Sequence, residues 1–250
     1  DNPGPFTFTG TGTYIVGRPD RGAEVAVIDP GPLDQAHLAA LMAAAALGVR
    51  NLLLLKGDDP KQGDQPDAKP VFDYDTAALT AVAVAIRDKG ELPTGRKVAG
   101  KAEFFIAAAD VPIDPPAGWE PKSLKAKLAA GCEFVQTQFC MDATVVRRYM
   151  ARLAEHGVNV PFLIGISPLR SAKAARWMRE KLFGTIIPDA TVARLEAASD
   201  PAAEGRKLCL DLMKELATIP GVAGVHIMAP GNEGAIADVI KDAVGLKRAR

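Results

Sequence analysis

The sequence has no net charge, because 30 Lys and Arg residues balance 30 Asp and Glu residues among 250. A neutral chain has no general electrostatic attraction for nucleic acid or anionic lipid, so we expect neither as a partner. Aromatic residues make up only 6% of a chain that is 48% hydrophobic. We therefore expect a core of Ala, Val, Leu and Ile, in a globular protein rather than a disordered one.

Cysteine is also scarce: the three residues are Cys132, Cys140 and Cys209, and no two of them form a CxxC pair. An odd number of dispersed cysteines argues against a disulfide framework and predicts a reducing, cytoplasmic location. No apolar run reaches the roughly 18 residues of a membrane span. The leading DNPGPFTF lacks the basic and apolar regions that indicate a signal peptide.

From residue 49 onward, short apolar runs alternate with longer segments of helical period. This alternation predicts a parallel sheet covered by helices. It leaves open a (β/α) barrel or an open doubly wound sheet, and both carry ligands at the carboxyl ends of their strands. The predicted strands are 51–55, 104–110, 134–139, 161–166 and 224–230, and the predicted helices are 75–90, 122–131, 143–157, 171–182, 204–221 and a last one from residue 233.

The first forty residues have a different pattern. Residues 6–17 and 23–29 are β-type runs separated by the turn-forming sequence RPDRG, which predicts an antiparallel hairpin. The Pro-Gly-Pro at residues 30–32 then ends the second strand, and Asp34 can cap a helix that continues to Leu47.

Several segments occur in a characteristic order between about residues 43 and 244: GVRNLLLLKGDDP, GCEFVQTQFCMD, PFLIGISPL, the IP of GTIIP, and GVAGVHIMAPGNE. Together they resemble the methylenetetrahydrofolate reductase family. The resemblance implies a (β/α)8 TIM barrel that holds FAD at the carboxyl ends of its strands. It also implies an enzyme of one-carbon metabolism, in which NADH or NADPH reduces the flavin. The flavin then reduces the folate substrate, 5,10-methylenetetrahydrofolate, to 5-methyltetrahydrofolate.

The same resemblance suggests two catalytic residues. Asp58, after Gly57, matches a family Asp near flavin and folate, where a carboxylate can stabilise a cationic form of the substrate. A loop Asp in a turn is the alternative. Gln138 matches a family Gln that contacts folate, and an amide suits a pterin edge because it both donates and accepts. A hydrogen-bonded polar residue at the barrel rim is the alternative there.

For the cofactor, the resemblance implies contacts from Gly57, Asp58, Phe72, Ala108 and Lys127. Lys127 matches a basic residue near the FAD phosphates, although a solvated helix lysine is equally compatible with its position. Phe72 matches an aromatic position in the flavin loop, and Ala108 lies where a strand backbone approaches the isoalloxazine ring. Asp75 matches a family Asp but equally suits a plain helix N-cap.

The sequence departs from the family before residue 51. Family members have three βα units there, and the first supplies a Glu proposed as general acid, whereas about fifty residues are too few for three units. We therefore predict a partial or rearranged TIM barrel with an N-terminal antiparallel β-hairpin, in an open sheet of five to seven strands to which the hairpin adds antiparallel strands. An open edge favours a homo-oligomer or a covering partner chain. Glu24, Asp29 or such a partner would have to supply the acid.

Residues 1–41 resemble the opening hairpin of a metallo-β-lactamase-fold hydrolase, through NPGPFTFTGTGTYIVG, VAVIDPGP and DQAHLAAL. The HxHxDH motif of that fold is absent, and the three histidines are widely separated in the sequence, so we expect no metal site. These are His37, His156 and His226. The sequence therefore predicts two parts, residues 1–41 and 42–250, joined as in a recombined, designed or mis-assembled chain.

Two functions compete at this point. The first is an FAD-dependent oxidoreductase of the folate pathway, which rests on the ordered set of motifs. The second is a non-catalytic chimera or remnant that folds and binds flavin or folate without turnover, which the missing first βα units favour.

Overall fold

The computed structural model is an α/β protein whose parallel strands alternate with helices, which confirms the predicted fold class. It describes residues 13–16, 25–28, 49–55, 59–62, 66–69, 74–98 and 102–243. The predicted helix after Asp34 and the predicted junction near residue 41 lie outside these ranges. The chain divides into two compact units, described separately below. Unit 1 comprises Asp1–Ala109 with Lys122–Glu133, and unit 2 comprises Asp110–Pro121 with Phe134–Arg250.

The strands of unit 1 confirm the predicted antiparallel hairpin. The second strand of this hairpin, however, runs parallel to the strand that follows it. Strands β1 and β2 pair in antiparallel fashion, but β2 pairs in parallel with β3, as β3 does with β4. The expectation that both hairpin strands run against the others is therefore wrong for β2. The connection between β2 and β3 is long enough for the crossover that parallel pairing requires. The strands are β1 (Thr13–Val16), β2 (Val25–Ile28), β3 (Asn51–Leu54) and β4 (Phe105–Asp110).

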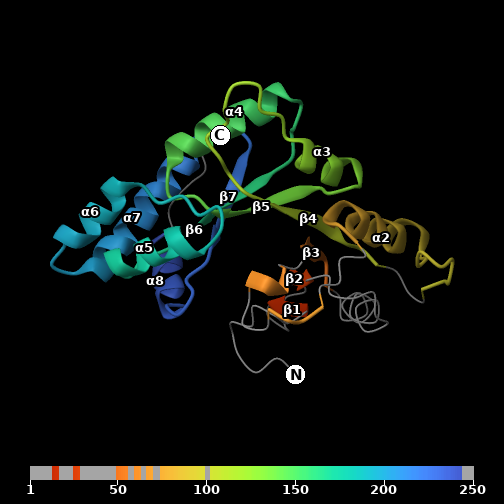
Figure 1. The fold of residues 1–250 in the computed structure, drawn as a ribbon, viewed down its shortest axis with the longest axis horizontal. Coiled ribbons are helices and arrows are strands. Elements are labelled where there is room, and N and C mark those ends of the chain that lie inside the picture. The colour runs from red at the N-terminus through yellow and green to blue at the C-terminus, as the bar shows by residue number, and fades with distance from the viewer. Residues whose placement is uncertain are drawn as a thin grey trace. The chain divides into compact units, whose positions relative to one another are not determined.

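Helix α2 (Thr76–Lys89) supplies one side of the core of unit 1 (Figure 1). The Asp75 carboxylate accepts a hydrogen bond of 2.8 Å from the Ala78 N–H and so caps the start of the helix. Gly90 ends it in the left-handed conformation, with φ of 62°. Full burial of a Leu, Ile or Val side chain contributes about 1.5–3 kcal/mol to the stability of the fold. The buried cluster includes Leu52, Leu54, Leu79, Val82, Ile86 and Ile106. The other helical segments of the unit are η1 (Pro60–Gln62) and α3 (Lys122–Ala129).

One side chain adds a hydrogen bond to the start of β4, on the edge away from β3. The N–H of Phe105 donates to Arg50 O on the β3 side at 2.5 Å, so the N–H of Ile106 points to the opposite edge. There the Glu133 carboxylate accepts it at 3.0 Å, while the Glu133 N–H donates to Ile106 O at 2.7 Å. Arg87 of α2 holds the same carboxylate at 2.6 Å. Glu133 thus bonds to Ile106 twice, through its main-chain N–H and through its side-chain carboxylate.

Unit 2 contains three parallel strands in chain order, with β5 beside β6 and β6 beside β7. Helices α5 to α8 gather into one group, in which successive helices contact one another (Figure 1). The strands are β5 (Phe134–Phe139), β6 (Phe162–Ile166) and β7 (Val222–Ile227). The helices are α4 (Ala143–Glu155), α5 (Ala172–Lys181), α6 (Asp189–Ala197), α7 (Pro201–Leu216) and α8 (Gly234–Asp242).

Aromatic side chains pack helix α4 against strand β6 in unit 2. Tyr149 of α4 and Phe162 of β6 are both fully buried, and their rings meet edge to face with centroids 6.3 Å apart. The side chains of Asp142, Ser171 and Asp200 cap the starts of α4, α5 and α7. Helix α6 was not predicted, because it follows Pro188 and has no side-chain cap hydrogen bond.

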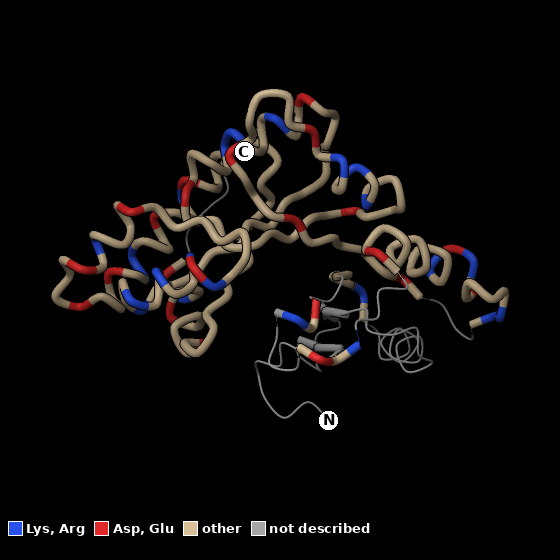
Figure 2. Tube along the Cα trace, viewed as in Figure 1, with Lys and Arg blue, Asp and Glu red and all other residues tan. Residues whose placement is uncertain are grey.

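Charges of both signs alternate along helices α5 to α8 (Figure 2). Arg176 of α5 pairs with Glu196 of α6, and Arg194 of α6 pairs with Glu204 of α7. Exposed pairs of this kind contribute little stability individually. They do favour one register between successive helices.

We predict that Glu133→Ala lowers the free energy of unfolding by about 1–2 kcal/mol, because it leaves the Ile106 N–H without its acceptor. In a chain of this length the loss corresponds to a fall in Tm of about 2–8 °C. Thermal denaturation followed by circular dichroism measures it. Glu133→Gln keeps an acceptor oxygen and should lose less. Equal losses in the two variants would show that the hydrogen bond to β4 is not the cause.

Candidate functional site

The carboxyl end of β5 has an irregular backbone that requires a glycine on the neighbouring strand. The register between β5 and β6 shifts between Gln136 and Phe139. A Cβ atom at Gly165 of β6 would lie only 2.4 Å from Thr137 O, so no other residue fits without a shift of the backbone. The Gly165 N–H also donates to the Thr137 hydroxyl at 2.9 Å. This close approach fixes the direction of the last residues of β5.

Gln138 lies within this irregularity, with its amide only partly used. Its Nε2 donates to Phe183 O at 3.1 Å, and its Oε1 accepts from the Phe139 N–H at 2.9 Å. An amide offers two N–H donors and two acceptor lone pairs. Among the described residues, one donor and one acceptor position of this amide therefore have no partner. The predicted contact of Gln138 with folate stays a prediction.

A second polar pair lies on the strands of unit 2. His226 of β7 is opposite Gly165 in the register with β6, and its Nδ1 lies 2.6 Å from Gln136 Nε2 of β5. Burial lowers the pKa of His226 to about 4, so the ring is neutral at neutral pH. Because an amide nitrogen only donates, Nδ1 accepts and the ring proton lies on Nε2. The strands thus hold a neutral imidazole in one tautomer.

Asp110, the last residue of β4, and the connection that follows it as far as Pro121 are held against α4 by three side-chain contacts. Burial, followed by the negative charge of Asp110, raises the pKa of the Tyr149 hydroxyl far above its usual range, so this hydroxyl remains a donor. The connection therefore has a fixed course along α4. The contacts are a hydrogen bond from Tyr149 to Asp110, two bonds of 2.7 and 2.8 Å from Arg148 to Asp114, and a contact of 3.0 Å between His156 Nε2 and Trp119 O.

In unit 1, Lys127 of α3 reaches back to the carboxyl end of β4. Side chains on a helix lean toward its N-terminus, and the Lys127 ammonium donates to Ala109 O at 2.7 Å. An ammonium has three N–H donors, so two remain for an anion. Lys127 is therefore not a fully solvated helix lysine, because the Ala109 carbonyl holds its ammonium at the end of β4.

Of the remaining predicted residues, the structure describes two, Ala108 and Asp75. Ala108 of β4 is fully buried and pairs with Leu54 of β3, so only its backbone is available to a ligand. Asp75 is the N-cap of α2, as its alternative interpretation predicted. Three further residues lie outside the part of the chain that the structure describes: Gly57, Asp58 and Phe72.

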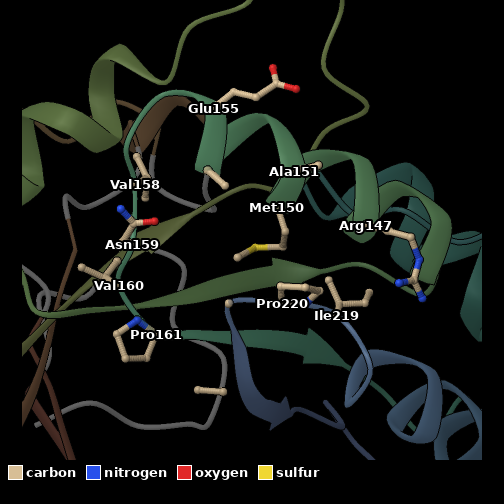
Figure 3. A pocket seen from close by; sticks show the side chains of 13 residues that line it. Arg147, Met150, Ala151, Glu155, Val158, Asn159, Val160, Pro161, Ile219 and Pro220 are labelled. Carbon is tan, nitrogen blue, oxygen red and sulfur yellow. The ribbon is translucent and has the colours of Figure 1, made fainter. Parts of the chain in front are cut away.

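A pocket of about 680 Å³ lies at the opposite end of the strands of unit 2 (Figure 3). It is bordered by the last turns of α4, around Met150, and by the segments that lead into β6 and β7, at Pro161 and Pro220. Parallel βα units bind substrates at the carboxyl ends of their strands, not at these amino ends. We therefore do not assign the pocket to the candidate site.

Sequence reasoning missed two features of unit 2. One is the pairing of Gln136 with His226, which are ninety positions apart. The other is Phe183, whose backbone oxygen holds Gln138. The only local signal for Phe183 is an aromatic residue followed by Gly184 after the end of a predicted helix.

The described residues also bear on cysteine nucleophiles, metal sites and membrane spans. All three cysteines are buried and free, and burial raises the pKa of Cys140 and of Cys209 to about 12, so these two thiols are poor nucleophiles. Among the residues described, no three His, Cys, Asp or Glu side chains form a group that could hold a metal ion. Within the same ranges, every helix is too short or too polar to cross a bilayer.

The parallel βα units of the chain define a β/α protein. A family model described as methylenetetrahydrofolate reductase matches residues 34–244. The chain belongs to this family.

Two curated relatives and one solved structure illustrate the similarity. The probable methylenetetrahydrofolate reductase (NADPH) of Caenorhabditis elegans is 26% identical over 206 residues, which cover 79% of this chain and 28% of that protein. Methylenetetrahydrofolate reductase 1 of Schizosaccharomyces pombe is 26% identical over 214 residues, which cover 81% of this chain and 32% of that protein. The chain thus spans less than a third of the length of each.

The solved structure is an uncharacterized protein from Clostridium thermocellum that binds two copies of 5-methyl-5,6,7,8-tetrahydrofolic acid. It is 14% identical, with a TM-score of 0.44, over 87% of this chain and 93% of that chain.

The partly buried His226 predicts a specific loss of stability in acid. Its folded pKa of about 4 lies below the ordinary value of 6.5, so the unfolded chain binds more protons between these pH values. The free energy of unfolding should therefore fall as the pH drops from about 6.5 to 4, by up to about 1.4 kcal/mol per pH unit. Urea denaturation at several pH values measures this slope.

His226→Gln removes the titrating group and should flatten this part of the profile relative to the original chain. An NMR titration of the imidazole protons gives the pKa directly. A midpoint at or above 6.5 would contradict the arrangement described for Gln136 and His226.

Proposed function

We propose that this chain contributes a flavin- and folate-binding part of a methylenetetrahydrofolate reductase. The reaction is the reduction of 5,10-methylenetetrahydrofolate to 5-methyltetrahydrofolate, with FAD as cofactor and NADH or NADPH as donor. The observation that carries the proposal is the family match over residues 34–244, which includes strands β3 to β7. Three free, buried cysteines suit a reducing compartment, and we propose the cytoplasm.

The residues of unit 1 fit part of a flavin nucleotide. Lys127 keeps two N–H donors at the carboxyl end of β4, where they can neutralise and bind a phosphate oxygen. The last residues of β4 before Asp110 are alanines, whose small side chains allow a flat ring to approach the strand end. When bound, the flavin would accept a hydride from the nicotinamide and deliver it to the folate.

The residues of unit 2 fit the other partner of the reaction. Gln138 keeps one donor and one acceptor, which match the alternating donors and acceptors at the edge of a pterin ring. The bonds from its amide to Phe183 and Phe139 fix its orientation before a ligand arrives. A polar group held in advance loses little entropy on binding.

Three residues enter the proposal through the resemblance alone. We assign Asp58 the stabilisation of positive charge on the folate during the reaction. Gly57 and Phe72 are assigned to the flavin-binding loop. The general acid is left to a residue outside the described ranges or to another chain.

The direct experiment is flavin reconstitution followed by turnover. The purified chain is mixed with FAD, and its spectrum is recorded after removal of free flavin. We expect a yellow protein that oxidises NADH or NADPH with a quinone acceptor and reduces 5,10-methylenetetrahydrofolate. Absence of a general acid would slow the folate step by about 10²–10⁴-fold.

A colourless protein after addition of FAD would contradict the proposal. Flavin binding and quinone reduction without any folate reduction would instead favour the non-catalytic alternative.

Lys127 provides a prediction with a control on the same helix. Lys127→Ala should weaken FAD binding about tenfold or more, because a charge-assisted contact to phosphate is lost. Quenching of flavin fluorescence during a titration measures the affinity. Lys125→Ala removes the same charge from an exposed position on α3 and should leave the affinity nearly unchanged. Equal effects of the two variants would indicate a general effect of charge and not a phosphate contact.

A further inference from the structure

Phe183 is the most exposed of the large apolar side chains noted in the described ranges, at 86%. It follows α5 directly, and its neighbour Leu182 ends that helix. Single exposed apolar residues are common and need no function. The position of this one, beside the carboxyl end of β5, is what distinguishes it.

The backbone around Phe183 is fixed to β5. Ile186 donates to Phe139 O at 3.0 Å, and its own oxygen accepts from the Met141 N–H at 2.8 Å. Phe183 O accepts the bond from the Gln138 amide. The segment that carries the exposed ring therefore runs along the end of the strand that carries Gln138.

The turn after Phe183 is also fixed. Gly184 has φ of +74°, a conformation that favours glycine. A Cβ atom at this position would lie 2.3 Å from Val111 Cγ1, so the chain passes close to the connection that follows β4. An aromatic ring held on a rigid backbone presents a flat apolar face to solvent with little freedom to lose on binding.

We propose that Phe183 is a stacking platform for the flat ring system of the reduced folate, while Gln138 binds the edge of the same ring. The inference rests on the proposed function and adds a residue that determines specificity. A ring stacked on Phe183 covers apolar surface that is otherwise exposed. The bond between Phe183 O and the Gln138 amide fixes the spacing between the stacking face and the hydrogen-bonding group.

The test is binding of 5-methyltetrahydrofolate, measured by isothermal titration calorimetry. Phe183→Ala should weaken binding about tenfold and leave Tm and FAD affinity unchanged, because the side chain is exposed. Phe183→Tyr keeps a ring and should bind nearly as well as the original chain. Phe183→Leu keeps an apolar side chain without a ring and should be almost as weak as Phe183→Ala. Ile240→Ala, at another exposed apolar residue of unit 2, serves as the matched control and should have no effect.

Unchanged folate affinity in Phe183→Ala, with clear binding by the original chain, would overturn the inference and leave the proposed function intact. Full affinity in Phe183→Leu would overturn stacking. Equal losses of folate and FAD affinity in Phe183→Ala would overturn the assignment to folate. Failure of the original chain to bind 5-methyltetrahydrofolate would overturn the proposed function itself.

Discussion

The close approach of β5 to Gly165 is the constraint on which the candidate site of unit 2 depends. The backbone of residues 137 and 138 occupies the space that a side chain at position 165 would fill. The same contact places the Thr137 hydroxyl as an acceptor for the Gly165 N–H. On this strand end the Gln138 side chain is held by the bonds of its own amide to Phe183 O and to the Phe139 N–H. The backbone path at the end of β5 thus depends on the absence of a Cβ atom at position 165.

The rest of unit 2 holds this strand end rigid. The segment after α5 pairs with the end of β5 through Ile186, and α4 holds the connection that follows β4 through Tyr149, Arg148 and His156. These contacts combine a buried phenol, a two-bond ion pair and a backbone carbonyl, so they do not depend on a single type of interaction. A binding site built on elements held in this manner keeps its shape when no ligand is present.

Much of the secondary structure could be predicted because its signals are local. Asp75, Asp142 and Ser171 are N-caps, and their side chains accept hydrogen bonds from residues two or three positions further on. The apolar runs of β5 and β6 are short and bounded, as strands buried on both faces should be. Helix α6 escaped prediction because no side chain caps it. The direction of β2 could not be predicted either, since strand pairing depends on a crossover and not on the residues of the strand.

The sequence by itself determined the family, the alternation of strands and helices, and the place of Gln138 at the end of a strand. These features depend on residue type and order, which are local properties. Only the tertiary structure decided that Lys127 bonds to Ala109, that Gln136 pairs with His226, and that Phe183 stands beside Gln138. Each of these contacts joins residues at least 18 positions apart. Such contacts are set by the register of the strands and the packing of helices, which no short segment specifies.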